Sequence, residues 1–530
     1  MPSLSTTDLV WRTPEGVTVL DGITLALGPG RHGLLGRNGC GKSTLLRLLA
    51  GELAPVSGTV RVQGRLAWLP QDVAHDPVRP VAEVLGVAGA LAALRAIEAG
   101  STDQADFDAV GDDWDVEERA RAGLDGLGLG GLTLDRPVGT LSGGEAVLVS
   151  LSALLLRHPD ILLLDEPTNN LDRSARAHLY GAVRDFGGVI LAVSHDRDLL
   201  DLMDDLGELS GRGLRWYGPG FEAYREAVDA QAASAEQLVV QARAEVRRQR
   251  RELAAAETRQ ARSDRKGRQE IASGSMPKIV AHAMHNAAEK TAGRTRGVHL
   301  ARLDEARDTL DEARDALPER VRIRLDLPDT VVPTGRQVLT LTGVRPRHTS
   351  LDVTLDMRGP ERLALTGPNG VGKTSLLRVI AGVDAPLSGH AELRVPVRTL
   401  PQSLRLLRDD RTVLENVLAV APQAAPQAIR EQLATLGFRG RGVEQPVRTL
   451  SGGERWRATL GALLLATPAP QLLLLDEPTN NLDLDAIAAL IQALECYRGA
   501  LIVVSHDERF LAEAHLDDRL DVTTGVLRWP

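Results

Sequence analysis

Two glycine-rich segments carry residues suited to phosphate chemistry. GRNGCGKST spans Gly36 to Thr44, and GPNGVGKTS spans Gly367 to Ser375. In a GxxxxGK[ST] segment the glycines let backbone N–H groups turn toward phosphates, the lysine reaches the β- and γ-phosphates, and the hydroxyl ligates Mg²⁺. The helix expected after each segment adds the positive end of its dipole. The two segments therefore predict two sites for a nucleoside triphosphate.

Each segment follows an apolar run (HGLL or LALT) and precedes a helix-like run (LLRLLAG or LLRVIAG), as a phosphate-binding loop requires. The predicted phosphate-binding lysines are Lys42 and Lys373, and Ser43 and Thr374 are predicted Mg²⁺ ligands. The nucleotide-binding residues assigned to the first loop are Gly36, Arg37, Asn38, Gly39, Cys40, Gly41, Lys42, Ser43 and Thr44. Those assigned to the second are Gly367, Pro368, Asn369, Gly370, Val371, Gly372, Lys373, Thr374 and Ser375.

The octapeptide DEPTNNLD occurs twice, starting at Asp165 and at Asp476, each time after an apolar run. A position at the end of a buried strand brings Asp165 and Asp476 close to the Mg²⁺ ion. The next residue in each copy, Glu166 or Glu477, is the natural general base for the attacking water. A carboxylate pair that only capped a turn would not explain the identical neighbours.

A histidine follows each octapeptide at the same distance. His195 and His506 lie in VSHD segments, each 30 residues after the first aspartate of the octapeptide. Although a lone histidine is usually structural, the matched spacing favours contact with the γ-phosphate and orientation of the water. Because both copies keep the glutamate and the histidine, we expect both sites to hydrolyse nucleotide.

These motifs belong to a large internal repeat. In each copy 35 residues separate the first loop glycine from a glutamine, Gln71 in WLPQ or Gln402 in TLPQ. LSGGE then begins at Leu141 and again at Leu450, 70 residues after the first glutamine but 48 after the second. Five matched motifs in one order, with short apolar runs alternating with helix-like segments, predict two α/β domains with largely parallel sheets.

The residues between the copies have a different pattern. Apolar residues recur at three- and four-residue steps at Leu238, Ala242, Val246, Leu253 and Ala256, and again at Leu303, Ala306, Leu310, Ala313 and Leu317. This spacing is typical of a helix–helix seam. A turn signal, SGSMPKI, lies between the two stretches, with Pro277 placed to begin a helix. We predict an antiparallel helical hairpin whose first helix runs from about residue 222 to about residue 264.

The predicted fold is therefore α/β, with two phosphate-loop nucleotide-binding domains at 4–220 and 334–530, joined by a helical hairpin at 221–333. A net charge of −9 argues against binding nucleic acid over the whole surface, so any such contact must be local. Two cysteines fit a reducing compartment. No apolar stretch approaches 18 residues and no signal peptide pattern begins the chain, so no membrane span or secretion is expected.

One local concentration of positive charge stands out in the linker. Residues 241–268 contain ten basic and four acidic side chains. A solvated coiled coil could carry such a run, but one dominant sign that continues into the tip favours RNA. The predicted RNA-binding residues are Arg247, Arg248, Arg251, Lys266, Lys278, His282, His285, Asn286 and Lys290.

The motif set resembles that of ATP-binding cassette proteins, because ordinary phosphate-loop NTPases lack LSGGE. The resemblance covers both repeats and implies ATP and Mg²⁺, with Gln71 and Gln402 near the metal. It also implies head-to-tail docking of the two cassettes within a monomer. One site then combines the first phosphate loop with Ser451, Gly452 and Gly453. The other combines the second phosphate loop with Ser142, Gly143 and Gly144.

Two cassettes joined by a helical hairpin, with no membrane domain, resemble the ABC-F subfamily. Its members are cytoplasmic translation factors and antibiotic-resistance proteins that protect the ribosome. The resemblance implies a cytoplasmic protein whose linker, 221–333, reaches ribosomal RNA and P-site tRNA. The 22 extra residues before the first LSGGE fall where this subfamily carries a ribosome-contacting arm. They are acidic (EAGSTDQADFDAVGDDWD), so a long RNA-binding arm is not expected.

The base-binding side differs between the copies. Cassettes place an aromatic ring about 25 residues before the phosphate loop, and Trp11 holds that position in the first copy. Ordinary core packing is the alternative role for Trp11. The second copy offers only Arg345, Arg347 or His348 in this region, which predicts weaker selectivity for adenine.

Three other functions remain open from the sequence. The chain could be the ATPase of a transporter with a separate membrane subunit, although the basic linker has no role there. It could be a DNA-associated ATPase, although coiled coils in those proteins usually split one cassette. It could be a non-catalytic scaffold, against which the intact glutamates and histidines argue.

Overall fold

The computed structural model describes residues 1–71, 76–211, 213–272, 278–315, 323–400, 406–522 and 526–528. The chain divides into two compact units. One unit contains Met1–Phe221 and Val321–Pro530, and the other contains Glu222–Arg320. Among the described residues, no helix combines the length and the apolar character needed to cross a membrane.

The first cassette is built around a six-stranded sheet whose strand order is β5-β6-β7-β3-β8-β9. Its strands are β5 (Leu66–Leu69), β6 (Ile161–Asp165), β7 (Val189–Val193), β3 (Gly30–Leu35), β8 (Asp205–Ser210) and β9 (Gly213–Tyr217). All neighbours are parallel except β8 and β9. A three-stranded antiparallel sheet adds β1 (Ser3–Arg12), β2 (Thr18–Leu27) and β4 (Ser57–Gln63).

The second cassette repeats this plan. Its five-stranded parallel sheet has the order β14-β15-β16-β12-β17. These strands are β14 (Val397–Leu400), β15 (Leu472–Asp476), β16 (Ala500–Val504), β12 (Arg362–Thr366) and β17 (Asp518–Asp521). A second sheet, ordered β13-β10-β11-β18, contains β13 (Ser388–Leu393), β10 (Gln337–Arg345), β11 (Asp352–Arg358) and β18 (Val526–Arg528). The predicted α/β class with largely parallel sheets is confirmed.

Continuous burial explains the central strands. Every residue of β6, β7, β15 and β16 is buried, as expected for strands covered on both faces of a parallel sheet. The helices around them include α1 (Lys42–Leu49), α6 (Gly143–Leu155), α7 (Arg173–Asp185) and α8 (Arg197–Leu200) in the first cassette. Their counterparts are α11 (Lys373–Ile380), α14 (Gly452–Leu464), α15 (Leu484–Cys496) and α16 (Glu508–Glu513). The buried strands and α-helices hold the motifs at the carboxyl edge of each sheet.

Short helices precede each LSGGE segment. In the first cassette they are α2 (Val81–Leu85), α3 (Ala88–Glu98), α4 (Gln104–Val110) and α5 (Val116–Gly126). In the second they are α12 (Val413–Val420) and α13 (Pro426–Thr435). The acidic insertion contributes α4 and its flanking turns, with Asp103 capping α4 by accepting a hydrogen bond from the Ala105 N–H. The extra length of the first cassette is therefore a short helical addition.

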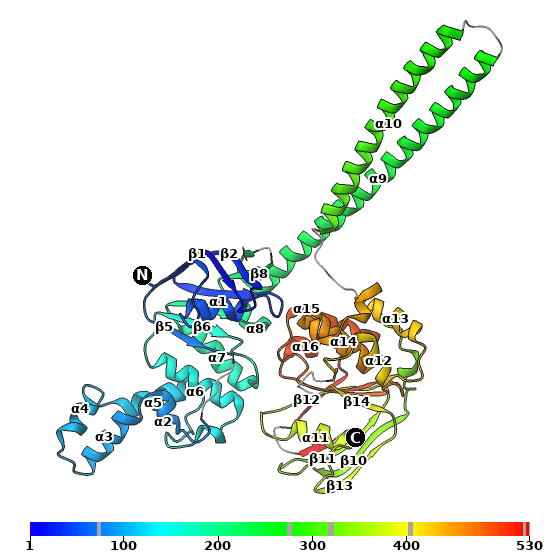
Figure 1. Cartoon of the computed structure of the whole chain (residues 1–530). Helices are drawn as coiled ribbons and strands as arrows, with labels where there is room; N and C mark the ends of the chain where they lie inside the picture. The colour runs from blue at the N-terminus through cyan, green and yellow to red at the C-terminus, as the bar shows by residue number, and fades with distance from the viewer. Residues whose placement is uncertain are drawn as a thin grey trace. The chain divides into compact units, whose positions relative to one another are not determined.

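The linker contains two long helices, α9 (Phe221–Ala272, 52 residues) and α10 (Lys278–Asp315, 38 residues), which lie side by side (Figure 1). The helical pair is confirmed, but the first helix is longer than predicted and ends at Ala272. Val239, Ala242 and Val246 of α9 pack against Leu303, Ala306 and Leu310 of α10.

One predicted seam residue was wrong. Leu238 is 53% exposed, whereas its neighbour Val239 is 4% exposed and faces the partner helix. Val239 lies three residues before Ala242, so it fits the three- and four-residue spacing of the seam as well as Leu238 does. Leu317 and Pro277 lie outside the described residues.

The seam predicts a sharp contrast between two leucines on α10. Leu303 is 4% exposed and Leu300 is 41% exposed. Leu303→Ala should lower the local unfolding free energy of the hairpin by about 2–3 kcal/mol, because it removes buried methyl groups and leaves a cavity. Leu300→Ala should change it by less than about 0.5 kcal/mol. Amide hydrogen exchange of α9 and α10 measures both, and equal effects would contradict the assigned seam.

Candidate functional site

The two phosphate loops have the same backbone form. Gly41 and Gly372 precede α1 and α11 in left-handed conformations, with φ of 102° and 113°. A Cβ on Gly41 would lie 2.8 Å from Leu20 Cδ2, so no other residue fits without displacement. Each loop thus ends directly at a helix N-terminus, where free N–H groups favour phosphate.

Both loop lysines are buried and turned into their own loops. Lys42 Nζ donates to Gly36 O at 2.6 Å and to Arg37 O at 3.2 Å. Lys373 Nζ donates to Gly367 O at 2.7 Å and to Pro368 O at 2.9 Å. Burial lowers the pKa of Lys373. Each ammonium group is thus held at the centre of the loop that would enclose the phosphates.

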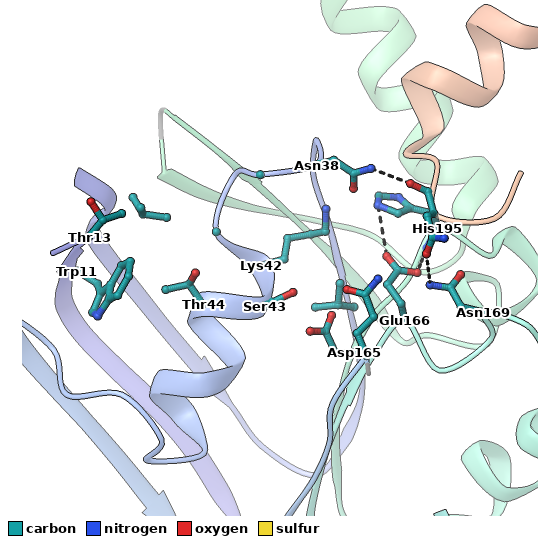
Figure 2. A pocket seen from close by; sticks show the side chains of 16 residues that line it. Trp11, Thr13, Asn38, Lys42, Ser43, Thr44, Asp165, Glu166, Asn169 and His195 are labelled. Carbon is teal, nitrogen blue, oxygen red and sulfur yellow. Dashed lines mark hydrogen bonds and ion pairs between the residues drawn. The ribbon is translucent and has the colours of Figure 1, made fainter. Parts of the chain in front are cut away.

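The first aspartate of each octapeptide lies at the end of a buried strand. Asp165 closes β6 and is 3% exposed, and Asp476 closes β15 and is 7% exposed. The Thr374 hydroxyl forms a hydrogen bond with the Asp476 carboxylate, and burial raises the pKa of Asp476. Ser43 points toward Asp165 in the first site (Figure 2).

These oxygen atoms suit a magnesium ion. Mg²⁺ binds hard oxygen ligands and usually takes one or two protein carboxylates together with substrate phosphates. A hydroxyl and a carboxylate converge beside each loop lysine, with Gln71 lining the first pocket. Gln402 lies outside the described residues. Among the described residues, no three His, Cys, Asp or Glu side chains form a metal-binding group.

Each glutamate meets the histidine predicted to work with it. Glu166 Oε1 lies 3.3 Å from His195 Nε2, and Glu477 Oε1 lies 3.4 Å from His506 Nε2. Both glutamates have positive φ values of 48° and 45°, a conformation that non-glycine residues adopt at a cost of roughly 1–3 kcal/mol. Their N–H groups donate to Val193 O and Val504 O at 2.8 Å, which ties each glutamate to the neighbouring strand.

Burial sets the protonation of these groups. It raises the pKa of Glu166 to about 8 and that of Glu477 to about 7. Burial lowers the pKa of His195, with a further contribution from the charge of Lys42, and it lowers that of His506 to about 4. Both imidazoles are therefore neutral near pH 7, so they can accept a hydrogen bond as well as donate one.

The predicted residues line two separate pockets. The first has a volume of about 540 Å³ and the second about 450 Å³. In the first, Trp11 lies at one end and Glu166 with His195 at the other, with Lys42 and Ser43 between them (Figure 2). This order matches a nucleotide whose base lies near Trp11 and whose γ-phosphate lies near Glu166.

The end of each octapeptide contacts the opposite phosphate loop, which the sequence interpretation missed. The Asn38 N–H donates to Asp483 Oδ2 at 2.9 Å, and Asn38 Nδ2 donates to Asn481 O at 3.0 Å. In the other direction the Asn369 N–H donates to Asp172 Oδ2 at 3.2 Å. Asn369 Nδ2 also donates to the Asn170 carbonyl at 2.9 Å. All eight residues of the octapeptide are identical in the two copies, although a chemical role was predicted for only the first two. This identity was the sequence signal that the later residues also have a role.

The LSGGE segments lie beside the opposite loops, to different degrees. Ser142 and Gly143 line the second pocket. A Cβ on Gly452 would lie 3.3 Å from Asn38 Cβ, which places this glycine at the first loop. Neither Ser451 nor Gly453 is among the residues that line the first pocket. Both serines begin helices with a capping box: Ser142 with Glu145 and Ser451 with Glu454.

The two base-binding ends differ because one β-hairpin is shorter. Asp8 and Gly343 occupy equivalent positions, because both have positive φ and both contact equivalent glycines. Leu20 lies 12 positions after Asp8. Only eight separate Gly343 from Leu351. Trp11 lies three residues after Asp8, and the residue three positions after Gly343 is a proline, Pro346. His348 and Thr349 line the second pocket instead, and Arg345 and Arg347 do not.

The linker residues predicted to bind RNA are only partly described. Arg247, Arg248, Arg251 and Lys266 are exposed on α9. The side chains of Lys278, His282, His285, Asn286 and Lys290 lie outside the described residues.

Comparison with known proteins identifies the class that this geometry defines. The family model described as ABC transporter matches residues 20–169 and 351–480, and the chain belongs to this ATP-binding cassette family as a tandem phosphate-loop ATPase. It is 35% identical to the tylosin resistance ATP-binding protein TlrC of Streptomyces fradiae, over 96% of each chain.

Two Escherichia coli (strain K12) proteins are also similar. The chain is 32% identical to the energy-dependent translational throttle protein EttA, over 93% of this chain and 87% of EttA. It is 32% identical to the probable ATP-binding protein YheS, over 95% of this chain and 76% of YheS. With these relatives the chain is a member of the ABC-F subfamily.

Solved structures share the fold at lower identity. A structure titled RNase-L Inhibitor has a TM-score of 0.55 and 21% identity, and covers 97% of this chain and 87% of its own. An archaeal ribosome recycling factor, aABCE1, in complex with the ribosomal stalk protein aP1 has a TM-score of 0.53 and 20% identity. Both likenesses describe the fold.

The position of Trp11 yields a binding prediction. Trp11→Ala should weaken ATP binding at the first site by about three- to tenfold, since aromatic stacking contributes about 0.5–1.5 kcal/mol. Trp114→Ala is the matched control, because Trp114 is 50% exposed and lies outside both pockets. Titration with a fluorescent ATP analogue measures both variants. Unchanged affinity for ATP in Trp11→Ala would show that this ring only packs against the core and does not stack on the base.

Proposed function

We propose that this ATPase acts on the ribosome through its helical linker, 221–333, either in translation or in protection from ribosome-targeting antibiotics. Two relatives support the proposal, because one is named for tylosin resistance and another for energy-dependent control of translation. The same proposal implies a cytoplasmic monomer whose cassettes, 4–220 and 334–530, pair within one chain.

The observation that carries the proposal is the exposed basic stripe of α9. Nine cationic side chains between residues 243 and 266 are exposed on this helix, in a chain whose net charge is −9. The acidic neighbours Glu245 and Glu252 lie near Arg248, at 2.8 and 3.8 Å. Exposed pairs of this kind contribute little and leave the cations available for phosphate.

The proposed chemistry places ATP between one phosphate loop and the opposite LSGGE segment. The carboxylate forms of Glu166 and Glu477, which the charges of Lys42 and Lys373 favour, accept a proton from the attacking water. His195 and His506 orient that water against the γ-phosphate. When bound, a Mg²⁺ ion would supply positive charge that offsets the charge of the phosphates. Ser43, Gln71 and Asp165 would hold the ion in the first site, and Thr374, Gln402 and Asp476 in the second.

The proposed cycle connects this chemistry to the linker. ATP binding draws each octapeptide and LSGGE segment against the opposite loop, and this closed state holds the linker in a ribosome-binding pose. The hairpin then contacts ribosomal RNA and reaches toward P-site tRNA. Hydrolysis removes the γ-phosphate that both cassettes contact, so the cassettes separate and the protein leaves the ribosome.

The double variant Glu166→Gln/Glu477→Gln tests this cycle. It keeps the shape of both sites but removes the general bases, so it should bind ATP, fail to hydrolyse it and stay on the ribosome. Co-sedimentation with ribosomes should rise by at least about tenfold over the unchanged protein in ATP. Lys42→Ala/Lys373→Ala should not show this rise, because it lacks the phosphate ligands. No gain in the glutamine variant would refute the cycle.

Charge changes on α9 test the role of the linker. Arg247→Glu/Arg251→Glu should weaken ribosome binding and reduce the slope of log K against log salt by about one for each phosphate that the variant no longer neutralises. Arg307→Ala/Arg314→Ala is the control, since both arginines are exposed on α10 and pair with Asp304 and Asp311. Equal binding by both double variants and the unchanged protein would exclude a role for the stripe. Antibiotic susceptibility of cells that express each variant separates resistance from a general role in translation.

A further inference from the structure

Arg176, on α7, has a buried guanidinium group that joins two functional segments of the first cassette. Its side chain is 13% exposed. Nη1 lies 3.2 Å from Asp196 Oδ2, and Nε donates to the Leu171 carbonyl at 3.2 Å. Asp196 follows His195 directly and also accepts a hydrogen bond from Tyr180 Oη at 2.8 Å. Arg176 therefore ties the segment that carries His195 to the end of the first octapeptide.

From Leu171 the polar contacts continue into the second site. The flanking residues Asn170 and Asp172 accept hydrogen bonds from Asn369 of the second phosphate loop. Asn369 Oδ1 lies 3.1 Å from His506 Nε2. The same His506 nitrogen lies 3.2 Å from Lys373 Nζ. A continuous series of contacts thus runs from Asp196, through Arg176 and the octapeptide, to His506.

The reverse series is interrupted at two places. The repeat places Ile487 where the first cassette has Arg176, and Ile487 is 2% exposed in the apolar core. Asp507, the counterpart of Asp196, accepts a hydrogen bond from the Phe510 N–H at 2.8 Å within its own cassette. Asn38 contacts Asp483 and Asn481, but within the described residues no hydrogen bond joins Asn38 to His195. The repeat is therefore symmetric in its motifs and asymmetric in this connection.

We propose that Arg176 is a positioning residue for the second ATP site: it holds the first octapeptide so that Asn369 fixes His506, and it makes turnover at that site depend on the segment that carries His195. The inference rests on the proposed roles of Glu166, Glu477 and the histidines. A shift of the octapeptide would move Asn369 and misplace His506, which slows the chemical step while nucleotide binding persists. Within the described residues no hydrogen bond joins Asn38 to His195, so we expect the first site to turn over independently of Ile487.

The experiment measures each site separately in the full chain. A Glu166→Gln background reports ATP hydrolysis at the second site, and a Glu477→Gln background reports it at the first. Arg176→Ile introduces the residue found at the equivalent position. It should lower kcat at the second site by about tenfold or more with KM within about twofold, and change kcat at the first by less than about threefold.

Matched variants separate positioning from general damage. Arg176→Lys should recover part of the second-site kcat, because an ammonium can still bond one of the two partners. Arg173→Leu lies one turn earlier on α7 and matches Leu484 of the other cassette. It should leave both sites unchanged, because Arg173 is 82% exposed and its ion pair with Glu508 at 3.5 Å is an exposed pair of the kind that contributes little.

A second variant tests the contact beyond Arg176. Asn369→Ala should also lower second-site kcat, and the combination with Arg176→Ile should be no slower than the slower single variant. Equal losses at both sites, an equal loss in Arg173→Leu, or no loss in Arg176→Ile would overturn the inference. Absence of turnover in both backgrounds with Arg176 intact would instead overturn the proposed function, and this inference with it.

Discussion

The structure depends on one reciprocal arrangement, in which the last aspartate of each octapeptide serves two partners. Asp172 Oδ1 accepts a hydrogen bond from the Ala175 N–H and caps α7, while Oδ2 accepts one from the Asn369 N–H. Asp483 does the same for α15 and Asn38. Because each carboxylate is fixed by its own helix, it reaches the opposite loop at little further entropic cost. Each of the two pockets is thereby lined by residues of both cassettes.

Residues that act through local sequence were predictable, and those that act through tertiary contacts were not. A phosphate loop is a strand, a turn and a helix in direct succession, so Lys42 and Lys373 could be assigned from their neighbours. Asp165 and Glu166 follow one strand in the same way. Asn170 and Asp172 also contact the other cassette, and no spacing within their own copy reveals a partner about 200 residues away.

The same limit explains the errors of detail. The counterpart of Trp11 in the second cassette was sought by counting back from the phosphate loop, which assumes hairpins of equal length, whereas four residues are missing between Gly343 and Leu351. In the linker, Leu238 and Val239 both satisfy a helical rhythm, and only packing against α10 decides that Val239 is buried. Sequence periodicity predicts that a seam exists, and neighbouring helices decide which adjacent residue enters it.

The two cassettes differ at one pair of equivalent positions where they touch. Asp198 and Arg509 occupy equivalent positions of the repeat and contact each other, with Arg509 Nε donating to Asp198 Oδ1 at 2.8 Å. A contact between equivalent positions lies on the local twofold axis that relates the two cassettes. If two copies of the same cassette paired in this way, two aspartates or two arginines would face each other. The differing sequences therefore favour the pairing of one cassette with the other.

This contact also reaches the first residue of the linker helix. The Phe221 N–H donates to Asp201 Oδ1 at 2.8 Å, and Arg509 of the second cassette donates to Oδ2 of the same carboxylate. Arg197 contacts Glu513 of the second cassette and lies 5.8 Å from the centre of the Phe221 ring. Arg197 lies on α8, and Arg509 and Glu513 lie on α16; these two helices directly follow the segments of His195 and His506. Phe221 therefore shares the Asp201 carboxylate with Arg509 and the Arg197 guanidinium with Glu513.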